Sequence, residues 1–121
     1  MFEKLTESPK KTEKPWGYEL LWARTNDYVA KVLFIRKGES LSLQFHREKE
    51  ETLFVESGEC VFEAGEDESC LKQITLGPGG VFHFPPKFIH RMTALTDCRI
   101  FEVSTPQIHD VVRLKDNYGR S

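Results

Sequence analysis

The amino-acid sequence predicts an all-β domain that is folded as a sandwich or a closed barrel. Short apolar runs recur along the chain, and glycine or proline interrupts them often. None of these runs has the length or the spacing of an amphipathic helix. With 121 residues, the chain is large enough for one hydrophobic core, so we expect a single domain.

Nine of the runs are predicted to be strands, because Val, Ile, Phe and Leu dominate them and each is only 4–8 residues long. In chain order they are Tyr18–Trp22, Tyr28–Ile35, Leu41–Phe45, Thr52–Val55, Cys60–Ala64, Cys70–Leu76, Val81–Phe84, Ile89–Ala94 and Arg99–Val103.

Turn sequences separate the predicted strands. They are Arg36-Lys-Gly-Glu, Glu56-Ser-Gly-Glu, Ala64-Gly-Glu-Asp, Leu76-Gly-Pro-Gly-Gly and Phe84-Pro-Pro-Lys, and the glycine or proline in each favours a reversal of the chain. A single helical turn is expected near Pro106–Asp110. Residues 1–14, rich in Lys, Glu and Thr, are expected to form a mobile or partner-docked arm. This leaves residues 15–121 as the domain.

The composition excludes several classes of partner. The formal net charge of −2 and the pI of about 6.1 give no electrostatic reason to expect binding to nucleic acid or to an anionic membrane. No apolar run approaches the ~18 residues of a membrane span, and the polar N-terminus lacks the apolar region of a signal peptide. The three cysteines, Cys60, Cys70 and Cys98, show no CxxC spacing. We expect them to be free thiols that pack as small apolar groups, which fits a cytoplasmic protein.

Polar side chains alternate with apolar ones in the run Leu41-Ser-Leu-Gln-Phe-His46. In a strand, successive side chains point to opposite faces, so Gln44 and His46 share one face while the leucines and Phe45 share the other. Gln44 and His46 therefore face either a polar cavity or solvent.

Two further residues favour the cavity. Glu51 follows shortly after His46, and His90 comes after the proline corner Pro85-Pro86 in an otherwise apolar run. A lone histidine there would be a core residue. Together with Gln44, His46 and Glu51, however, it completes a set of nitrogen and oxygen donors suited to a divalent metal ion with open coordination positions.

The same residues carry a family resemblance. Gly38-x5-Gln44-x-His46-x4-Glu51-x6-Gly58 resembles the first cupin motif, with Gln44 in place of the usual histidine. Gly79-x5-Pro-Pro-Lys87-x2-His90 resembles the second motif, although Lys87 replaces the usual glycine and Ala94 stands where asparagine is common. The resemblance implies a single-domain double-stranded β-helix, or jelly-roll barrel. It also implies that Gln44, His46, Glu51 and His90 are the metal ligands.

Three segments narrow the resemblance. They are Lys14-Pro-Trp-Gly-Tyr-Glu19, Leu41–His46 and the tail from Asp110 to Arg120. In this order they resemble the type II phosphomannose isomerase cupin, which is often fused behind a mannose-1-phosphate guanylyltransferase, and the related stand-alone small cupins. The implied function is metal-dependent isomerisation of mannose-6-phosphate to fructose-6-phosphate. Zinc is the first expectation for the metal, with Mn, Fe, Co or Ni as alternatives.

Lys31 and Arg113 are the candidate residues for contact with the substrate. Lys31 interrupts an apolar run and is either a buried lysine that exchanges protons or a lysine at a sheet edge. Arg113, in the tail, either binds a sugar phosphate or pins the tail to the barrel by a salt bridge. His83 is expected on the outer face, and Glu102 either holds a positive pocket residue or is paired elsewhere.

The sequence also predicts an oligomeric state and a class of ligand. Trp16 is predicted to anchor a homodimer across a two-fold axis, with stacking on a sugar as the alternative. The main alternatives to an isomerase are a sugar-binding module without catalysis and an iron-dependent oxygenase. All of them predict a sugar, a sugar phosphate or another small molecule as the ligand.

Overall fold

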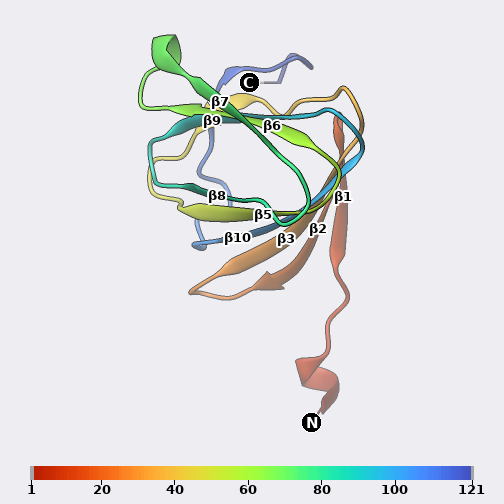
Figure 1. The fold of residues 1–121 in the computed structure, drawn as a ribbon. Helices are drawn as coiled ribbons and strands as arrows, with labels where there is room; N and C mark the ends of the chain where they lie inside the picture. The colour runs from red at the N-terminus through yellow and green to blue at the C-terminus, as the bar shows by residue number, and fades with distance from the viewer. Residues whose placement is uncertain (1, 121) are drawn as a thin grey trace.

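A computed structural model describes residues 2–120 and shows two antiparallel sheets that curve around a common interior (Figure 1). The six-stranded sheet consists, in spatial order, of β1 (Lys10–Lys14), β2 (Gly17–Arg24), β3 (Val29–Ile35), β10 (Cys98–Ser104), β5 (Glu51–Ser57) and β8 (Val81–Phe84). The five-stranded sheet consists of β11 (Val112–Lys115), β4 (Leu43–Phe45), β9 (Ile89–Ala94), β6 (Cys60–Gly65) and β7 (Lys72–Leu76). The prediction of an all-β jelly-roll barrel is confirmed.

All nine predicted strands are present, and two more occur at sheet edges. Strand β1 pairs with β2 along its whole length, so residues 10–14 belong to the sheet although they were expected in the arm. This strand was not predicted because its sequence, Lys-Lys-Thr-Glu-Lys, contains no apolar residue. Charged residues are common on edge strands. Strand β11 pairs with β4 and was not predicted, because it is short and carries charged residues.

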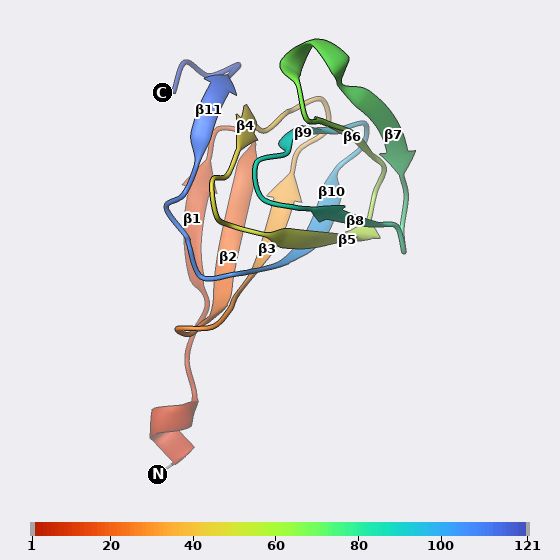
Figure 2. The same cartoon turned by 90° about the vertical axis from the view of Figure 1, so that its left-hand side faces the viewer.

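The helical content is confined to two short 3-10 helices within residues 2–120, η1 (Phe2–Leu5) and η2 (Glu68–Cys70). Neither could span a membrane. The single helical turn expected near Pro106–Asp110 occurs as an isolated hydrogen-bonded turn and not as a helix, with the N–H of Asp110 donating to the carbonyl oxygen of Gln107 at 3.2 Å. Figure 2 shows η1 at the end of an arm that projects away from the barrel, and its side chains are not buried.

The interior changes character along the strands. Strand β10 lies between β3 and β5, and its inward-facing Ile100 sits opposite Leu33 and Val55, all of them buried. Two residues further along β10, Glu102 sits opposite Lys31, also buried. The same alternation therefore builds an apolar core at one end of the barrel and a chamber lined by ionisable groups at the other.

Aromatic rings connect the core to this chamber. Phe62, Phe82 and Phe84 form a cluster with ring centroids 4.6–6.2 Å apart. Phe84 also stacks on the ring of His90, with centroids 4.0 Å apart. Rings packed in this way have few alternative rotamers, so the core fixes the orientation of His90.

Two sequence expectations need correction. Trp16 is only 4% exposed and packs in the core of its own chain, which removes it as a dimer anchor. Its burial follows from the chain entering β2, where its carbonyl oxygen accepts from the N–H of Arg36. Cys60 and Cys98 are buried free thiols as predicted, but Cys70 ends η2 and is exposed.

Candidate metal centre

Three of the four predicted ligands meet in one buried cluster. The Nε2 atom of His90 lies 3.1 Å from Oε1 of Glu51, and Nε2 of His46 lies 3.5 Å from the same oxygen. The candidate donor atoms all lie within 4.8 Å of one another. His46 follows β4, Glu51 begins β5 and His90 lies in β9, so both sheets contribute to the cluster.

Gln44, the fourth predicted ligand, lies beside this cluster. It is the Cα partner of His90 in the β4–β9 ladder, and directly opposed residues of an antiparallel pair project to the same face. Gln44 lines the cavity, and its Oε1 accepts from the hydroxyl of Ser42 at 3.3 Å. Its place is that of a side chain adjacent to the three-residue cluster, and its role as a ligand stays a prediction.

The hydrogen bonds of the two histidines reveal what the cluster lacks. Nδ1 of His46 lies 2.5 Å from the carbonyl oxygen of Asp110, and Nδ1 of His90 lies 3.0 Å from that of Phe88. A carbonyl oxygen only accepts, so each Nδ1 carries a hydrogen, which leaves Nε2 as the nitrogen whose lone pair can bind a metal ion. Both Nε2 atoms are buried without a hydrogen-bond partner.

Two nitrogen lone pairs and a carboxylate oxygen thus converge with no hydrogen to share. Glu51 contributes its charge as a carboxylate, since its other oxygen pairs with the ammonium group of Lys49 at 3.1 Å. Convergent buried acceptors repel one another unless a cation lies among them. The residues present therefore fit a divalent metal ion, with the Nδ1 hydrogen bonds supplying the outer support that metal-binding histidines require.

Lys49 holds the other oxygen of Glu51. Its buried Nζ lies 3.1 Å from Oε2 of Glu51 and 3.3 Å from Oε2 of Glu102. Burial lowers the pKa of Lys49, but these two carboxylates more than offset it and hold the pKa above its usual value. Burial and the charge of Glu51 raise the pKa of Glu102, against the opposing effect of Lys49. Lys49 thereby leaves Oε1 of Glu51 turned toward the histidines.

Sequence reasoning missed Lys49 because it sits in the polar loop Arg47-Glu-Lys-Glu50, which resembles a solvated turn. Asp110 explains why this loop enters the barrel. Its carboxylate accepts from the backbone N–H groups of Arg47, Glu48 and Lys49 at 3.0, 2.7 and 2.9 Å. Partial burial opposes the effect, but these bonds lower the pKa of Asp110. The tail therefore clamps the loop that carries His46 and Lys49.

A second backbone link joins this loop to the proline corner. The N–H of Lys87 donates to the carbonyl oxygen of His46 at 2.6 Å. Lys87 has a φ of 72° and is the single non-glycine residue with positive φ among residues 2–120. This left-handed conformation explains why glycine is usual at this position of the motif, since a side chain there costs roughly 1–2 kcal/mol.

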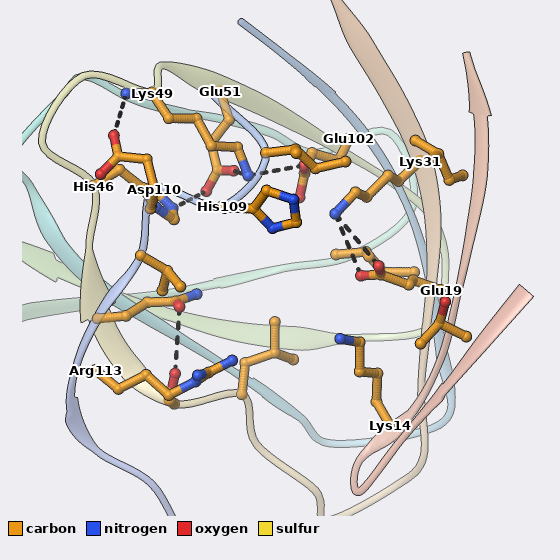
Figure 3. Close-up of a pocket in the computed structure, with 18 of the residues that line it drawn as sticks. Lys14, Glu19, Lys31, His46, Lys49, Glu51, Glu102, His109, Asp110 and Arg113 are labelled. Atoms are coloured by element: carbon orange, nitrogen blue, oxygen red, sulfur yellow. Dashed lines mark hydrogen bonds and ion pairs between the residues drawn. The ribbon is translucent and has the colours of Figure 1, made fainter. Parts of the chain in front are cut away.

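The cluster opens into a cavity of about 480 Å³ between the sheets (Figure 3). Seven cationic side chains line it against four carboxylates, so its wall carries an excess of positive charge. The cations are Lys10, Lys14, Arg24, Lys31, Lys49, Arg113 and Arg120, and the carboxylates are Glu19, Glu51, Glu102 and Asp110.

The structure places both predicted substrate-contacting residues on this wall. Lys31 is buried on β3, a central strand, and its Nζ lies 3.4 Å from Oε1 of Glu19. Of the two sequence alternatives, the buried lysine is therefore correct and the lysine at a sheet edge is wrong. Arg113 belongs to β11 and is the Cα partner of Gln44. Figure 3 shows Glu102 between Lys31 and Lys49. Glu102 therefore pairs with a positive pocket residue, as one sequence alternative held.

Strand β1 adds two cations that sequence reasoning assigned to the arm. Lys10, Thr12 and Lys14 line the cavity, whereas Lys11 faces outward, over the Tyr18 ring and beside Glu13 at 3.3 Å. Within the described residues, neither Lys10 nor Lys14 has a carboxylate partner. His83 also follows its prediction: it lies on the outer face, half exposed, with Nε2 2.6 Å from Glu50.

Known proteins share this architecture. The family model described as a cupin domain matches residues 32–104. No curated protein sequence matches the chain. Among solved structures, KdgF from Halomonas sp. is similar over 81% of this chain and 86% of its own, with a TM-score of 0.69 and 21% identity.

Two longer proteins contain a similar domain. The capsular polysaccharide assembling protein CapF from Staphylococcus aureus is similar over 92% of this chain, with a TM-score of 0.74 and 18% identity. Oxalate decarboxylase from Bacillus subtilis is similar over 88% of this chain, with a TM-score of 0.75 and 14% identity. This chain spans 35% of CapF and 30% of the decarboxylase, a protein for which Mn(II) centres are described. The shared fold and the cluster of His46, Glu51 and His90 together support a divalent metal site.

Proposed function

Because this chain belongs to the cupin domain family, we propose that it is a metal-dependent enzyme that isomerises a sugar phosphate, specifically mannose-6-phosphate to fructose-6-phosphate. One observation carries the proposal: two unpartnered Nε2 atoms converge on one carboxylate oxygen beside a cation-rich cavity. The sequence resemblance to the type II phosphomannose isomerase cupin supplies the specific reaction.

The proposed ligand set is His46, Glu51, His90 and Gln44. Three of these are neutral, so a bound divalent ion would keep about one positive charge. Such an ion would supply an electrophile for neighbouring carbonyl and hydroxyl oxygens, which aldose–ketose isomerisation requires. Zinc is the first proposal for the ion, and manganese is the first alternative to test.

The chain's own residues take the other proposed roles. Lys31 is buried on the cavity wall opposite Glu102, where an ammonium or amine group can exchange a proton with a bound sugar. Lys49 is a positioning residue, because its two bonds go to Glu51 and Glu102. The buried chamber around these side chains limits the access of water to the reacting carbons.

Phosphate recognition is proposed for the opposite part of the cavity. Figure 3 shows Lys14 and Arg113 on the side away from Lys49 and Glu51. The ammonium groups of Lys10 and Lys14 have no carboxylate partner in residues 2–120, so a phosphate can use their charge without breaking an ion pair. The guanidinium of Arg113 offers a planar fork for the same anion.

The activity test uses purified protein loaded in turn with Zn, Mn, Fe, Co and Ni, and measures fructose-6-phosphate formed from mannose-6-phosphate. The proposal expects product with at least one metal, and no product with any of them would contradict it. Lys31→Met should lower kcat about 100-fold at unchanged metal content. Lys14→Met should raise KM about tenfold, whereas Lys11→Met, on the outward face of the same strand, should leave KM unchanged.

One observation favours a second candidate, a sugar-binding module without turnover. Lys31 already forms an ion pair with Glu19, which ties up the proposed proton-transfer group. This alternative predicts that mannose-6-phosphate raises the melting temperature of the metal-loaded protein and yields no product.

A further inference from the structure

His109 lines the cavity but is outside the candidate metal cluster. It belongs to the segment between β10 and β11, and its neighbour Asp110 lines the same cavity. Figure 3 shows the imidazole ring of His109 in the cavity, between the side that holds Glu51 and the side that holds Lys31. The residue is exposed rather than packed in the core, so its ring borders the space that a bound sugar would occupy.

The backbone at His109 is fixed beside the metal centre. The carboxylate of Asp110, the next residue, accepts from the three backbone N–H groups of residues 47–49, and its carbonyl oxygen lies 2.5 Å from Nδ1 of His46. The carbonyl oxygen of His109 itself accepts from the N–H of Val111 at 3.0 Å. Adjacent Cα atoms are about 3.8 Å apart. The side chain of His109 therefore starts from a held point close to His46.

The imidazole of His109 has no partner among residues 2–120: it forms no hydrogen bond, ion pair or ring contact there. The other three of the four histidines are engaged. Nδ1 of His46 and of His90 each donate to a carbonyl oxygen, and Nε2 of His83 lies 2.6 Å from Glu50. Within the described chain, His109 alone keeps both ring nitrogens available to a ligand in the cavity.

The carboxylates of the cavity wall are less suited to take a proton from carbon. Glu19 pairs with Lys31 at 3.4 Å, and Glu51 and Glu102 share Lys49. A carboxylate beside a cation is a weaker base, because the cation favours its charged form. An imidazole without a partner has no such interaction to lose, and imidazole is the side chain that most readily exchanges protons near neutral pH.

We propose that His109 transfers the carbon-bound proton of the isomerisation, an inference that rests on the proposed function. A ring nitrogen of neutral His109 takes the proton from C2 of mannose-6-phosphate. The electrons of the C2–H bond form the C1–C2 double bond, and those of the C1 carbonyl bond pass to O1, which takes a proton from the ammonium group of Lys31. The product of this half-reaction is an enediol.

The second half-reaction restores both residues. The amine of Lys31 takes the proton from O2, and the electrons of that O–H bond form the C2 carbonyl. The electrons of the C1–C2 double bond take the proton from the imidazolium of His109, which gives C1 its second hydrogen. Fructose-6-phosphate results, His109 is neutral again and Lys31 is again an ammonium group.

This division of roles agrees with the ion pairs of the cavity. Lys31 faces Glu19 at 3.4 Å as an ammonium group, which is the form that gives a proton to O1. His109, without an ion pair, begins as the acceptor of the carbon-bound proton. The pairing of Lys31 with Glu19 is therefore compatible with turnover, because Lys31 acts on oxygen and His109 acts on carbon.

Kinetics of the protein loaded with the metal that supports wild-type turnover test the proposal. His109→Gln keeps a polar side chain of similar size but removes the proton-accepting nitrogen. It should lower kcat about 100- to 1,000-fold, with KM within about threefold of wild type and with the same metal content by elemental analysis. His83→Gln is the matched control, because His83 lies on the outer face, and it should keep the wild-type kcat.

Chemical rescue separates a proton carrier from a structural residue. His109→Ala opens space at an exposed position, so free imidazole should raise the kcat of this variant about tenfold. The same imidazole should leave the kcat of Lys31→Met unchanged. Circular dichroism melting checks that each variant is folded.

Three results would overturn the inference. If the wild type is active and His109→Gln keeps kcat within about threefold, His109 is not the proton carrier, although the proposed isomerase stands. If imidazole does not restore His109→Ala, or if the variants lose metal together with activity, the role of His109 is structural. If the wild type forms no product with any metal, the proposed isomerase and this inference are both wrong.

Discussion

Replacing Lys49 by methionine tests the charge arrangement behind the candidate metal centre. Methionine keeps most of the side-chain volume but removes the ammonium group that bonds Glu51 and Glu102 at 3.1 and 3.3 Å. Lys49, Glu51 and Glu102 have side chains only 4–8% exposed, so water cannot replace the lost bonds. Two buried carboxylates then face each other without the cation that bonded both.

The burial of these side chains sets the expected loss in free energy of unfolding. Removing one partner of a buried ion pair costs about 3–5 kcal/mol. The lower end applies here, because Glu102, whose pKa is already raised by burial and by Glu51, can take up a proton. A loss of about 3 kcal/mol in a domain of this size lowers the melting temperature by roughly 12 °C.

Differential scanning calorimetry of the metal-free protein measures this shift. The control is Lys11→Met, which removes an exposed ion pair with Glu13, with side chains 54% and 73% exposed, and should cost less than 1 kcal/mol. The double variant Lys49→Met/Glu102→Gln should recover part of the loss because only one buried carboxylate remains. A melting temperature for Lys49→Met within about 3 °C of wild type would refute the reasoning.

Further predictions concern ligand removal, the clamp and acid stability. Chelation should lower the melting temperature of the wild type, since a metal at 1,000 times its Kd contributes about 4 kcal/mol; His90→Ala should show no such shift, and His83→Ala should behave as wild type. Asp110→Ala leaves three backbone N–H groups of the loop without their acceptor, and should weaken metal binding about 10–100-fold in a competition titration. Arg120 holds the pKa of Asp116 below its usual 3.8, although burial opposes this. The folded-state pKa is the lower one, so this stability is complete above the usual pKa and is lost as the pH falls through the folded value. Urea midpoints should therefore fall less steeply below pH ~4 in Asp116→Asn than in the wild type.

Much of the barrel can be predicted from the sequence because its central strands have few alternatives. Tyr28–Ile35 and Arg99–Val103 combine apolar composition with clear turns at both ends, and both form strands. Edge strands lack this signal: β1 is Lys-Lys-Thr-Glu-Lys, and its strand state depends on pairing with β2 rather than on its own residues.

The same contrast applies to the site. Alternation within Leu41–His46 correctly places Gln44 and His46 on one face, since that information is local; that this face borders a cavity and not solvent depends on residues distant in the sequence. Lys49 depends on a distant residue, because Asp110 bends the loop inward through three backbone bonds. Trp16 was predicted to lie at the surface and is buried instead. A tryptophan beside a proline resembles a surface anchor, but the entry into β2 turns it into the core.

Metal content measured by elemental analysis tests the metal centre most directly. Purified protein is stripped with chelator, reloaded with zinc or manganese and freed of excess ion by gel filtration. The wild type should retain about one equivalent of metal per chain, and His46→Ala and His90→Ala should each retain less than about a tenth. A folded wild type that retains no stoichiometric metal, or a His90→Ala variant that retains as much as the wild type, would contradict the assignment.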